Sequence, residues 1–415
     1  MNKNRPHRSS ASLMSAALAL PIVAIPVSVG AQKTPQATAQ TASILPAGAV
    51  IGLRSLWYRE DGNRMKITEP VLWIKSPIGE SWEIAASATV DMVSGASPII
   101  VSNATGKPVQ IYTGASITDT RKASDVSLTR KYGALNENTI NVSAATSNEE
   151  DYDSNAFGLN ATFDFNERNT TLALGVGSRR DRVMSVTDNT LNAARNAQEF
   201  LVGITQLIDR RTLVQTNLTV TKLTGYLDDP YKLTFSFFRD QPLPPPSPPL
   251  SPVILSRDLR PDSRIQIAWL TRGKRALPNA GAVVSAEYRY YSDTWKIRSH
   301  TIAGAWLQTV NETLQIEAGL RYYSQTAANF YRAEITQRPG TPNAPRYTSS
   351  DQRLAAFGIF EPSIKVIVKL TEQLQFDIGV ARYMQRQQWQ LGGNGSSAFE
   401  SLNARSIQSG VVYKF

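Results

Sequence analysis

Apolar and polar side chains alternate with a period of two along most of the chain after Val50. In the stretch 82–92 the even positions hold tryptophan, isoleucine, alanine, valine and methionine, whereas the odd positions include Glu83, Ser87 and Asp91. Successive side chains of a β-strand point to opposite faces. The pattern therefore predicts strands that have one apolar and one polar side.

The same alternation recurs at 157–165, 172–176, 314–323 and 374–381. The polar sides of these segments contain Glu, Asp and Arg, which do not suit the packed core of a soluble protein. Apolar-out, polar-in strands of about ten residues are typical of membrane β-barrels.

Connection lengths distinguish a membrane barrel from a sandwich, because outer-membrane barrels join their strands by short turns at one end and longer loops at the other. The sequence indicates tight turns at 76–80, 166–169, 209–211, 310–313 and 371–373, and long stretches near 94–124, 179–198, 228–262, 324–353 and 386–403.

We therefore expect an all-β fold, a transmembrane antiparallel up-and-down β-barrel of about sixteen strands, with fourteen or eighteen as alternatives. Both ends of the barrel then lie on the short-turn side. A barrel of this width cannot be filled by the side chains of its wall, so its interior holds water unless a loop enters it. The expected strands are 50–60, 65–75, 80–92, 125–132, 137–147, 155–165, 170–178, 199–208, 212–224, 263–271, 281–291, 295–308, 314–323, 354–370, 373–385 and 404–415.

The first residues indicate export. Three basic residues precede an apolar run over 13–29, and small residues end it at Ala31, as in a cleaved secretory signal. The alternative, an uncleaved anchor helix, is disfavoured because two prolines interrupt a run that is already short for a bilayer. The expected organisation is a signal peptide at 1–31, a flexible periplasmic lead-in at 32–48 and an outer-membrane barrel at 49–415.

The chain ends in an aromatic residue on an alternating segment, with Val411, Tyr413 and Phe415 on one side. This ending resembles the terminal strand by which the barrel assembly machinery recognises its substrates. An ordinary edge strand that happens to end in phenylalanine is the alternative.

Several segments resemble one family of uncharacterised outer-membrane β-barrel proteins of Gram-negative bacteria, known only as a domain of unknown function. The resemblance extends over nearly the whole chain after the leader and implies a barrel, but it implies no activity and no catalytic residues. The segments that carry it are 90–98 (VDMVSGASP), 114–121 (GASITDTR), 225–232 (GYLDDPYK), 260–264 (RPDSR), 288–295 (YRYYSDTW) and 320–325 (LRYYSQ).

Charged residues on the polar sides of the strands are candidates for lining the lumen. Arg289 and Arg321 share their faces with Glu287 and Glu317, and such groups either select permeating ions or neutralise one another. A third candidate pair ends the stretch 94–124, which either folds into the bore or forms a surface loop. The lumenal candidates are Arg289, Arg321, Glu287, Glu317, Asp119 and Arg121.

Other charged and proline-rich segments are expected in the outer loops. The arginines Arg179, Arg180 and Arg182 are candidates for contacting lipopolysaccharide phosphates. The acidic group 149–153 is a candidate for a divalent cation that bridges the same lipids, and the proline-rich segment 242–252 for an extended arm. A solvated loop or a spacer is the more common explanation for each group.

Composition excludes several classes of function. The chain has no cysteine and two histidines, so we expect no disulfide, no metal centre and no cofactor. A hydrolase would depend on His300, the only histidine left after cleavage, and we expect no enzyme. The net charge of +10 is scattered rather than clustered, which argues against nucleic acid.

We therefore expect a porin-like channel or transporter for small hydrophilic solutes. The alternative is a non-conducting structural or assembly barrel that scaffolds a periplasmic or surface partner. The expected partners are the outer membrane, lipopolysaccharide and the barrel assembly machinery.

Overall fold

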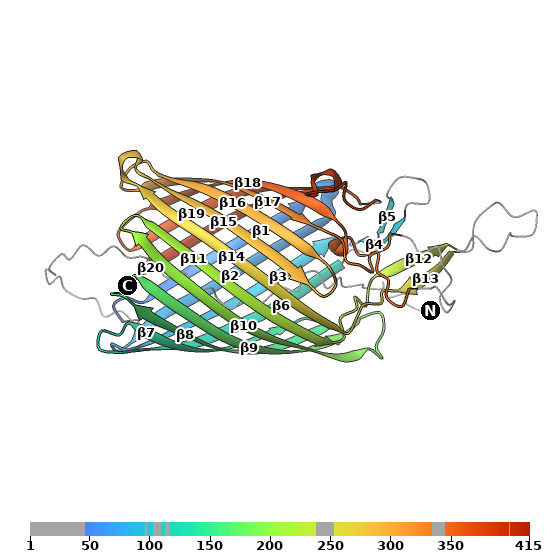
Figure 1. The fold of residues 1–415 in the computed structure, drawn as a ribbon, viewed down its shortest axis with the longest axis horizontal. Helices are drawn as coiled ribbons and strands as arrows, with labels where there is room; N and C mark the ends of the chain where they lie inside the picture. Colours follow the sequence, from blue (N-terminus) through green and yellow to red (C-terminus); the bar gives the residue numbers. More distant parts are fainter. Residues whose placement is uncertain are drawn as a thin grey trace, which may run out of the picture.

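Sixteen strands of the computed structural model pair side by side, and the last pairs with the first, so the sheet closes into one antiparallel barrel (Figure 1). The structure describes residues 46–95, 98–102, 109–112, 117–237, 253–333, 345–397 and 399–415. The expected signal peptide and the proline-rich segment lie outside these residues. The prediction of about sixteen strands is confirmed.

The wall follows chain order, and two small hairpins interrupt the numbering. Its strands are β1 (Val50–Glu60), β2 (Met65–Ile78), β3 (Trp82–Gly95), β6 (Ile117–Tyr132), β7 (Asn138–Asn148), β8 (Tyr152–Phe165), β9 (Thr170–Met184), β10 (Asn192–Asp209), β11 (Thr212–Gly225), β14 (Ser263–Leu277), β15 (Ala282–Asp293), β16 (Arg298–Thr309), β17 (Leu314–Gln325), β18 (Phe357–Lys369), β19 (Leu374–Arg386) and β20 (Leu402–Lys414). The hairpins are β4 (Pro98–Ser102) with β5 (Val109–Tyr112), and β12 (Leu233–Phe237) with β13 (Val253–Arg257).

The seam between β1 and β20 closes the wall. Its register runs from Val50 opposite Lys414 to Glu60 opposite Ala404. Beyond the strand ends, the Phe415 amide donates to the Ala49 carbonyl at 2.9 Å. Both ends of the barrel therefore lie at one rim, as the parity of the strands predicts.

The outer surface carries the apolar side of each strand. Leu53 opposes Leu72 across β1 and β2, and both side chains are 51% exposed. The adjacent, inward positions are polar along much of the wall; Asn141 of β7, for example, opposes Asn160 of β8. An exposed apolar belt around a polar interior is the arrangement of a barrel that spans lipid.

The connections differ in length at the two rims. The turns at 79–81, 166–169, 210–211, 310–313 and 370–373 all lie at the rim that holds the barrel ends, which we call the turn rim. The opposite rim, the loop rim, carries the connections 96–116, 226–262, 326–356 and 387–401. Four short 3-10 turns also occur, η1 (Asp61–Asn63), η2 (Pro278–Ala280), η3 (Gln352–Leu354) and η4 (Gln387–Trp389).

Several strands extend further toward the loop rim than the sequence predicts. β6 begins at Ile117 rather than 125, β9 ends at Met184 rather than 178, and β10 begins at Asn192 rather than 199. The predicted long connection 179–198 is therefore wrong, because only 185–191 lie between these strands. Beyond the lipid both faces of a strand meet water or polar groups, so the alternation that marks a membrane strand is lost.

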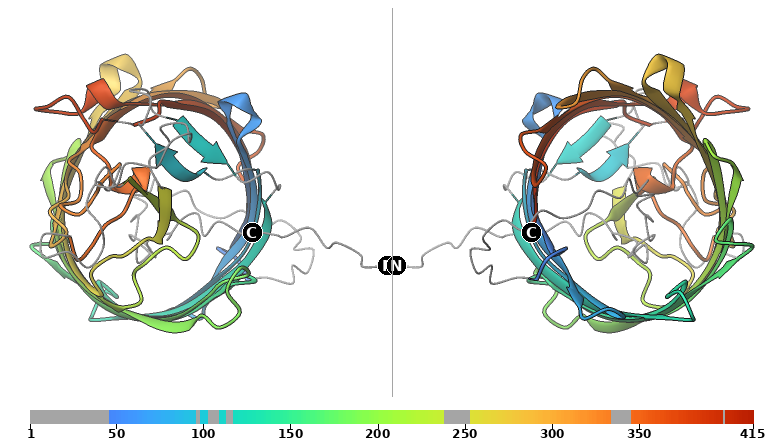
Figure 2. Two further views of the ribbon diagram at one scale, coloured as in Figure 1. Left: turned by 90° about the vertical axis from the view of Figure 1, so that its right-hand side faces the viewer. Right: turned by 90° about the vertical axis from the view of Figure 1, so that its left-hand side faces the viewer.

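The main apolar core lies at the loop rim. Viewed toward that rim, the β4–β5 hairpin, the β12–β13 hairpin and the η3 segment lie within the ring outline of the barrel (Figure 2). Figure 1 places the β4–β5 and β12–β13 hairpins beyond the end of the wall, and residues 117–124 of the predicted long stretch 94–124 belong to the wall strand β6. No helix among the residues described above is long and apolar enough to cross a membrane.

The two faces of one strand provide a test of the lipid boundary. Leu218 near the middle of β11 is 41% exposed and faces outward, whereas Thr219 faces inward. We expect Leu218→Lys to lower the free energy of unfolding by about 2–4 kcal/mol, because an outward ammonium would lie in hydrocarbon. Thr219→Lys is the control and should cost much less. Urea unfolding of the barrel in lipid vesicles measures both, and equal losses would contradict the assignment of faces.

Candidate functional site

Oppositely charged side chains form a belt on the inner wall from β14 to β19. Arg321 Nη1 lies 2.9 Å from Glu361 Oε2, and Lys365 Nζ lies 3.3 Å from Asp377 Oδ1. Nearby, a cavity of about 300 Å³ opens along β14–β18. Its charged lining residues are Arg272, Lys274, Glu287, Glu317, Arg321 and Glu361.

The belt contains four of the lumenal candidates. Glu287, Glu317 and Arg321 line the cavity, and Arg289 lies on the inward face of β15, two residues beyond Glu287. Arg321 forms its ion pair with Glu361 of the neighbouring strand rather than with Glu317 of its own strand. Four residues along one strand separate side chains by about 13 Å, whereas directly opposed residues on paired strands lie about 5 Å apart.

The other two lumenal candidates lie near the loop rim on β6. Arg121 Nε approaches Asp91 Oδ2 of β3 at 3.6 Å. Asp119 is 9% exposed, and its carboxylate lies with those of Glu149 and Asp151 so that one oxygen of each falls within 4.8 Å of the others. Three carboxylates at this spacing can share a divalent cation. The sequence analysis grouped Glu149 and Asp151 in one acidic segment but did not connect Asp119 with them.

Burial and the negative charges of Asp119 and Asp151 raise the pKa of Glu149 to about 7. The folded protein therefore retains a proton that an unfolded glutamate loses near pH 4.3. Stability from this group consequently falls as pH rises from about 4.3 to about 7.

We expect Asp119→Asn to lower the pKa of Glu149 by about one unit, because it removes a neighbouring negative charge. Asp153→Asn on the outward face of β8 is the matched control. A carboxyl-carbon NMR titration of both variants measures the change. An unaltered titration in Asp119→Asn would contradict the coupling.

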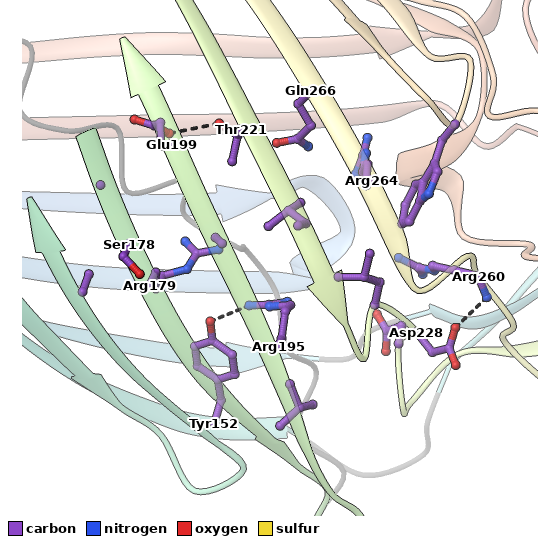
Figure 3. Close-up of a pocket in the computed structure, with 18 of the residues that line it drawn as sticks. Tyr152, Ser178, Arg179, Arg195, Glu199, Thr221, Asp228, Arg260, Arg264 and Gln266 are labelled. Carbon is purple, nitrogen blue, oxygen red and sulfur yellow. Dashed lines mark hydrogen bonds between the residues drawn. The ribbon is translucent and has the colours of Figure 1, made fainter. Parts of the chain in front are cut away.

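A second cavity, of about 350 Å³, lies between the β8–β14 wall and the loop-rim connections (Figure 3). Beside it, the buried carboxylate of Asp181 is shared by two arginines: Arg195 Nε donates to it at 2.7 Å, and Arg179 Nε lies 3.2 Å away. Ser154 Oγ also donates to Asp181 at 2.8 Å, and Arg195 donates to the Tyr152 hydroxyl. One carboxylate thus accompanies two cations on this wall.

The structure corrects the position of one lipopolysaccharide candidate. Arg179 lies within β9 and points into this cavity, whereas Arg180 and Arg182 are exposed on the outer face. Because β9 continues to Met184, the three arginines alternate between the faces instead of following the strand as one loop cluster. The contact of Arg180 and Arg182 with lipid remains a prediction.

Two further arginines form the other side of the cavity. Arg264 donates to Asp293 from Nε at 2.9 Å, and its guanidinium lies 4.1 Å from the centre of the Trp295 ring. Arg260 follows the β12–β13 hairpin and lies among the connections of the loop rim, which we call the mouth of the barrel. Arg260 Nε lies 2.5 Å from Asp258.

A buried ion network holds two connections, 226–262 and 326–356, together at the loop rim. Arg260 Nη2 donates to Asp351 at 3.0 Å, although 91 residues separate the two in sequence. Arg353 donates to both Asp351 and Asp229. Burial alone would raise the pKa of Asp351, but Arg353, Arg260 and Lys232 together hold the pKa well below its usual range. The network therefore requires an ionised Asp351.

An apolar group packs beside this network, and we call it the mouth cluster. It joins the 226–262, 294–297, 326–356 and 387–401 connections to the inward ends of the strands. Trp295 meets Phe330 edge-on at 5.1 Å, and Phe357 stacks on Phe399 at 5.0 Å. Its buried members are Leu227, Trp295, Ile297, Ala328, Phe330, Tyr331, Leu354, Ala355, Phe357, Ile359 and Phe399.

We expect the mouth network to loosen in acid. Because the pKa of Asp351 is lowered in the folded state, its stabilisation is complete above the unfolded value of about 3.9 and is lost as pH falls below it. Asp351→Asn should remove about 3–5 kcal/mol of local stability at neutral pH, since two arginines lose their shared carboxylate. Amide hydrogen exchange over 351–357 measures this. The exposed neighbour substitution Asp262→Asn should leave exchange unaltered, and equal protection in both variants would contradict the role of the network.

His300 lies outside the lumen. Tyr288 Oη is 2.9 Å from His300 Nδ1, and the Tyr290 ring centre lies 5.3 Å from that of His300. These side chains share the outer face of β15 and β16. The candidates for barrel insertion also lie at the surface: Val411 of β20 is exposed, and Tyr413 and Phe415 meet edge-on at 4.8 Å.

A family model described as Protein of unknown function (DUF3570) matches residues 10–199 and 187–406. The chain belongs to this family. The predicted resemblance to a domain of unknown function is thus confirmed, and this DUF3570 chain has a barrel like those of outer-membrane proteins. A search of curated proteins found no match.

Solved structures with a similar barrel share little sequence with the DUF3570 chain. "Bacterial polysaccharide outer membrane secretin" is 8% identical with a TM-score of 0.48, and the match covers 89% of this chain and 99% of that one. "CymD monoaromatic hydrocarbon channel" is 8% identical with a TM-score of 0.42, covering 89% of each. "Copper transporter OprC" is 9% identical with a TM-score of 0.41, covering 90% and 84%.

Sequence reasoning missed the groups that build the cavity near the mouth. Asp181, Arg195 and Asp351 stood in no motif and became partners only through strand pairing and loop packing. A signal did exist for others: the segments 225–232 and 260–264, quoted for the family resemblance, contribute Asp228, Asp229, Arg260 and Arg264 to its lining.

Proposed function

We propose that this DUF3570 protein is an outer-membrane channel or transporter for small hydrophilic solutes. The observation that carries the proposal is the charged belt on the inner wall of a barrel whose outer wall is apolar. Arg321 and Glu361 retain 42% and 28% side-chain exposure inside the ring, so they are accessible to water. Exposed charges of both signs along a lumen suit hydrated, polar solutes rather than apolar ones.

The mouth supports a restricted rather than a wide path. The mouth cluster and the buried ion network occupy part of the loop rim, and the β4–β5 hairpin lies over the opening. Next to them, the cavity that Arg179, Arg195, Arg260 and Arg264 line has a volume of about 350 Å³. The cavity along the belt has a volume of about 300 Å³, and charged side chains line both. A solute would thus meet arginine side chains before it reaches the belt.

The outer-membrane location rests on the expected leader at 1–31 together with the form of the barrel. The aromatic end at Tyr413 and Phe415 supports insertion by the barrel assembly machinery, because these residues continue the outer face of the closing strand. Outer-membrane barrels place their longer loops outside the cell. The loop rim would then be extracellular.

Ion conductance of the refolded chain in planar bilayers tests the proposal. We expect discrete conductance steps, and Arg321→Gln should shift the reversal potential toward cation selectivity, since it leaves the Glu361 charge in the lumen. Arg130→Gln is the control, because Arg130 lies over the Trp82 ring on the outer face and should not affect selectivity.

The alternative of a non-conducting scaffold predicts another result. Asp351→Asn should loosen the mouth and increase conductance if a path lies beneath it. If neither the unmodified chain nor Asp351→Asn conducts, the channel proposal fails and the scaffold is favoured.

A further inference from the structure

Four basic residues form a row across the seam of the barrel. Arg382 of β19 opposes Arg405 of β20, Arg405 opposes Arg59 of β1, and Arg59 opposes Lys66 of β2. Directly opposed residues of antiparallel strands lie on the same face, with Cβ atoms about 5 Å apart. We call Arg59, Lys66, Arg382 and Arg405 the seam row. It lies near the loop rim, where β1 ends and β2 begins.

The seam row lies on the outer surface. Two residues nearer the turn rim on the same strands, Val380, Ile407 and Trp57 oppose one another and are 46%, 44% and 42% exposed. These apolar side chains belong to the outer belt, and strand alternation places Arg382, Arg405 and Arg59 on their face. The row therefore borders the apolar belt on its loop side, where lipid headgroups begin.

The row carries more positive charge than the protein neutralises. Asp61 of η1 accepts from Arg382 Nη2 at 2.6 Å and lies 3.9 Å from Arg405 Nε. Within the described ranges, no carboxylate lies within 4.0 Å of the charged nitrogens of Arg59 or Lys66. Four cations beside one carboxylate leave three positive charges.

Like charges directly opposed across strands destabilise a sheet. The side chain of Arg405 is 74% exposed, and Arg59 and Lys66 are exposed as well, so these three cations are accessible to a ligand. Arginine presents a planar fork of donors that matches phosphate oxygens, and lysine adds a point charge. The expected ligand is therefore an anion with several phosphate oxygens.

We propose that the seam row binds the phosphate groups of lipopolysaccharide, with acyl chains against Trp57, Ile407 and Val380. The adjoining apolar side chains favour a lipid over free phosphate, because a soluble anion would make no use of them. The inference rests on the outer-membrane location in the proposed function, but it does not depend on conduction.

The row differs from the arginines that the sequence singled out. Arg182 of β9 lies directly opposite Asp153 of the neighbouring strand β8, and it donates to Asn192 Oδ1 at 2.8 Å. Arg180 lies between Asn155 and Asn196 on the neighbouring strands. These positions bring two cations and one acid together, compared with four cations and one acid in the seam row.

The test compares lipopolysaccharide binding to the full refolded barrel and to two variants. Arg59→Gln/Lys66→Gln/Arg405→Gln removes three cations and keeps Arg382 on Asp61, and Arg130→Gln, near the turn rim on the outer face, is the control. We expect the triple variant to bind about a hundredfold more weakly, at roughly fivefold per cation near a charged membrane surface. The control should change far less. Equal affinity of the triple variant and the unmodified barrel would overturn the proposal.

Further measurements distinguish lipid binding from the binding of a free anion and from conduction. Dephosphorylated lipopolysaccharide should bind the unmodified barrel as weakly as the intact lipid binds the triple variant. Inorganic phosphate should compete poorly with the lipid. Strong competition by phosphate would favour a free anion as the ligand and overturn the lipid assignment. Arg59→Lys/Arg405→Lys should retain most of the affinity, and circular dichroism establishes folding. Conductance should be unaltered in the triple variant, so a failure of the channel proposal remains distinguishable from a failure of lipid binding.

Discussion

The pairing of β1 with β20 is the contact on which the rest of the structure depends. A peptide group within hydrocarbon has no water to replace a missing hydrogen bond, and each unpaired group costs several kcal/mol. The eleven-residue register of the seam removes the last free edge, so every strand of the wall has two neighbours. Closure in turn divides every strand into a lipid face and a lumen face, and the alternation of side chains follows from that division.

Inside the ring, charged side chains form ion pairs with residues of adjacent strands rather than with residues of their own strand. Arg321 with Glu361 and Lys365 with Asp377 each join consecutive strands. At the loop rim, where connections cover the wall, the same principle works over larger sequence distances, and Asp351 joins the 326–356 and 226–262 connections through Arg260. Burial makes an unpaired charge there costly, so these groups set how firmly the mouth is held.

The apolar residues have two distinct roles in this barrel. Those of the outer belt, such as Leu53 and Leu72, stay exposed because lipid replaces a protein partner. Those of the mouth cluster, such as Trp295 and Phe330, form a conventional buried core, but within the loop rim. The outer belt could be predicted from the sequence by its period of two. The mouth cluster could not be predicted, because irregular loop segments have no period and their packing partners are distant in sequence.

The sequence by itself determined the barrel class, a count of about sixteen strands, the short-turn rim and the inward direction of Glu287, Arg289, Glu317 and Arg321, because the lipid boundary imposes a local two-residue pattern. It did not determine where strands end beyond the lipid, so Arg179 was assigned to an outer loop instead of to the inner face of β9. Only the tertiary structure decided that Arg321 meets Glu361, that Asp119 joins Glu149, and that Arg59, Lys66, Arg382 and Arg405 form one row. The reason is physical: alternation depends on neighbouring residues, whereas register between strands depends on the closure of the whole ring.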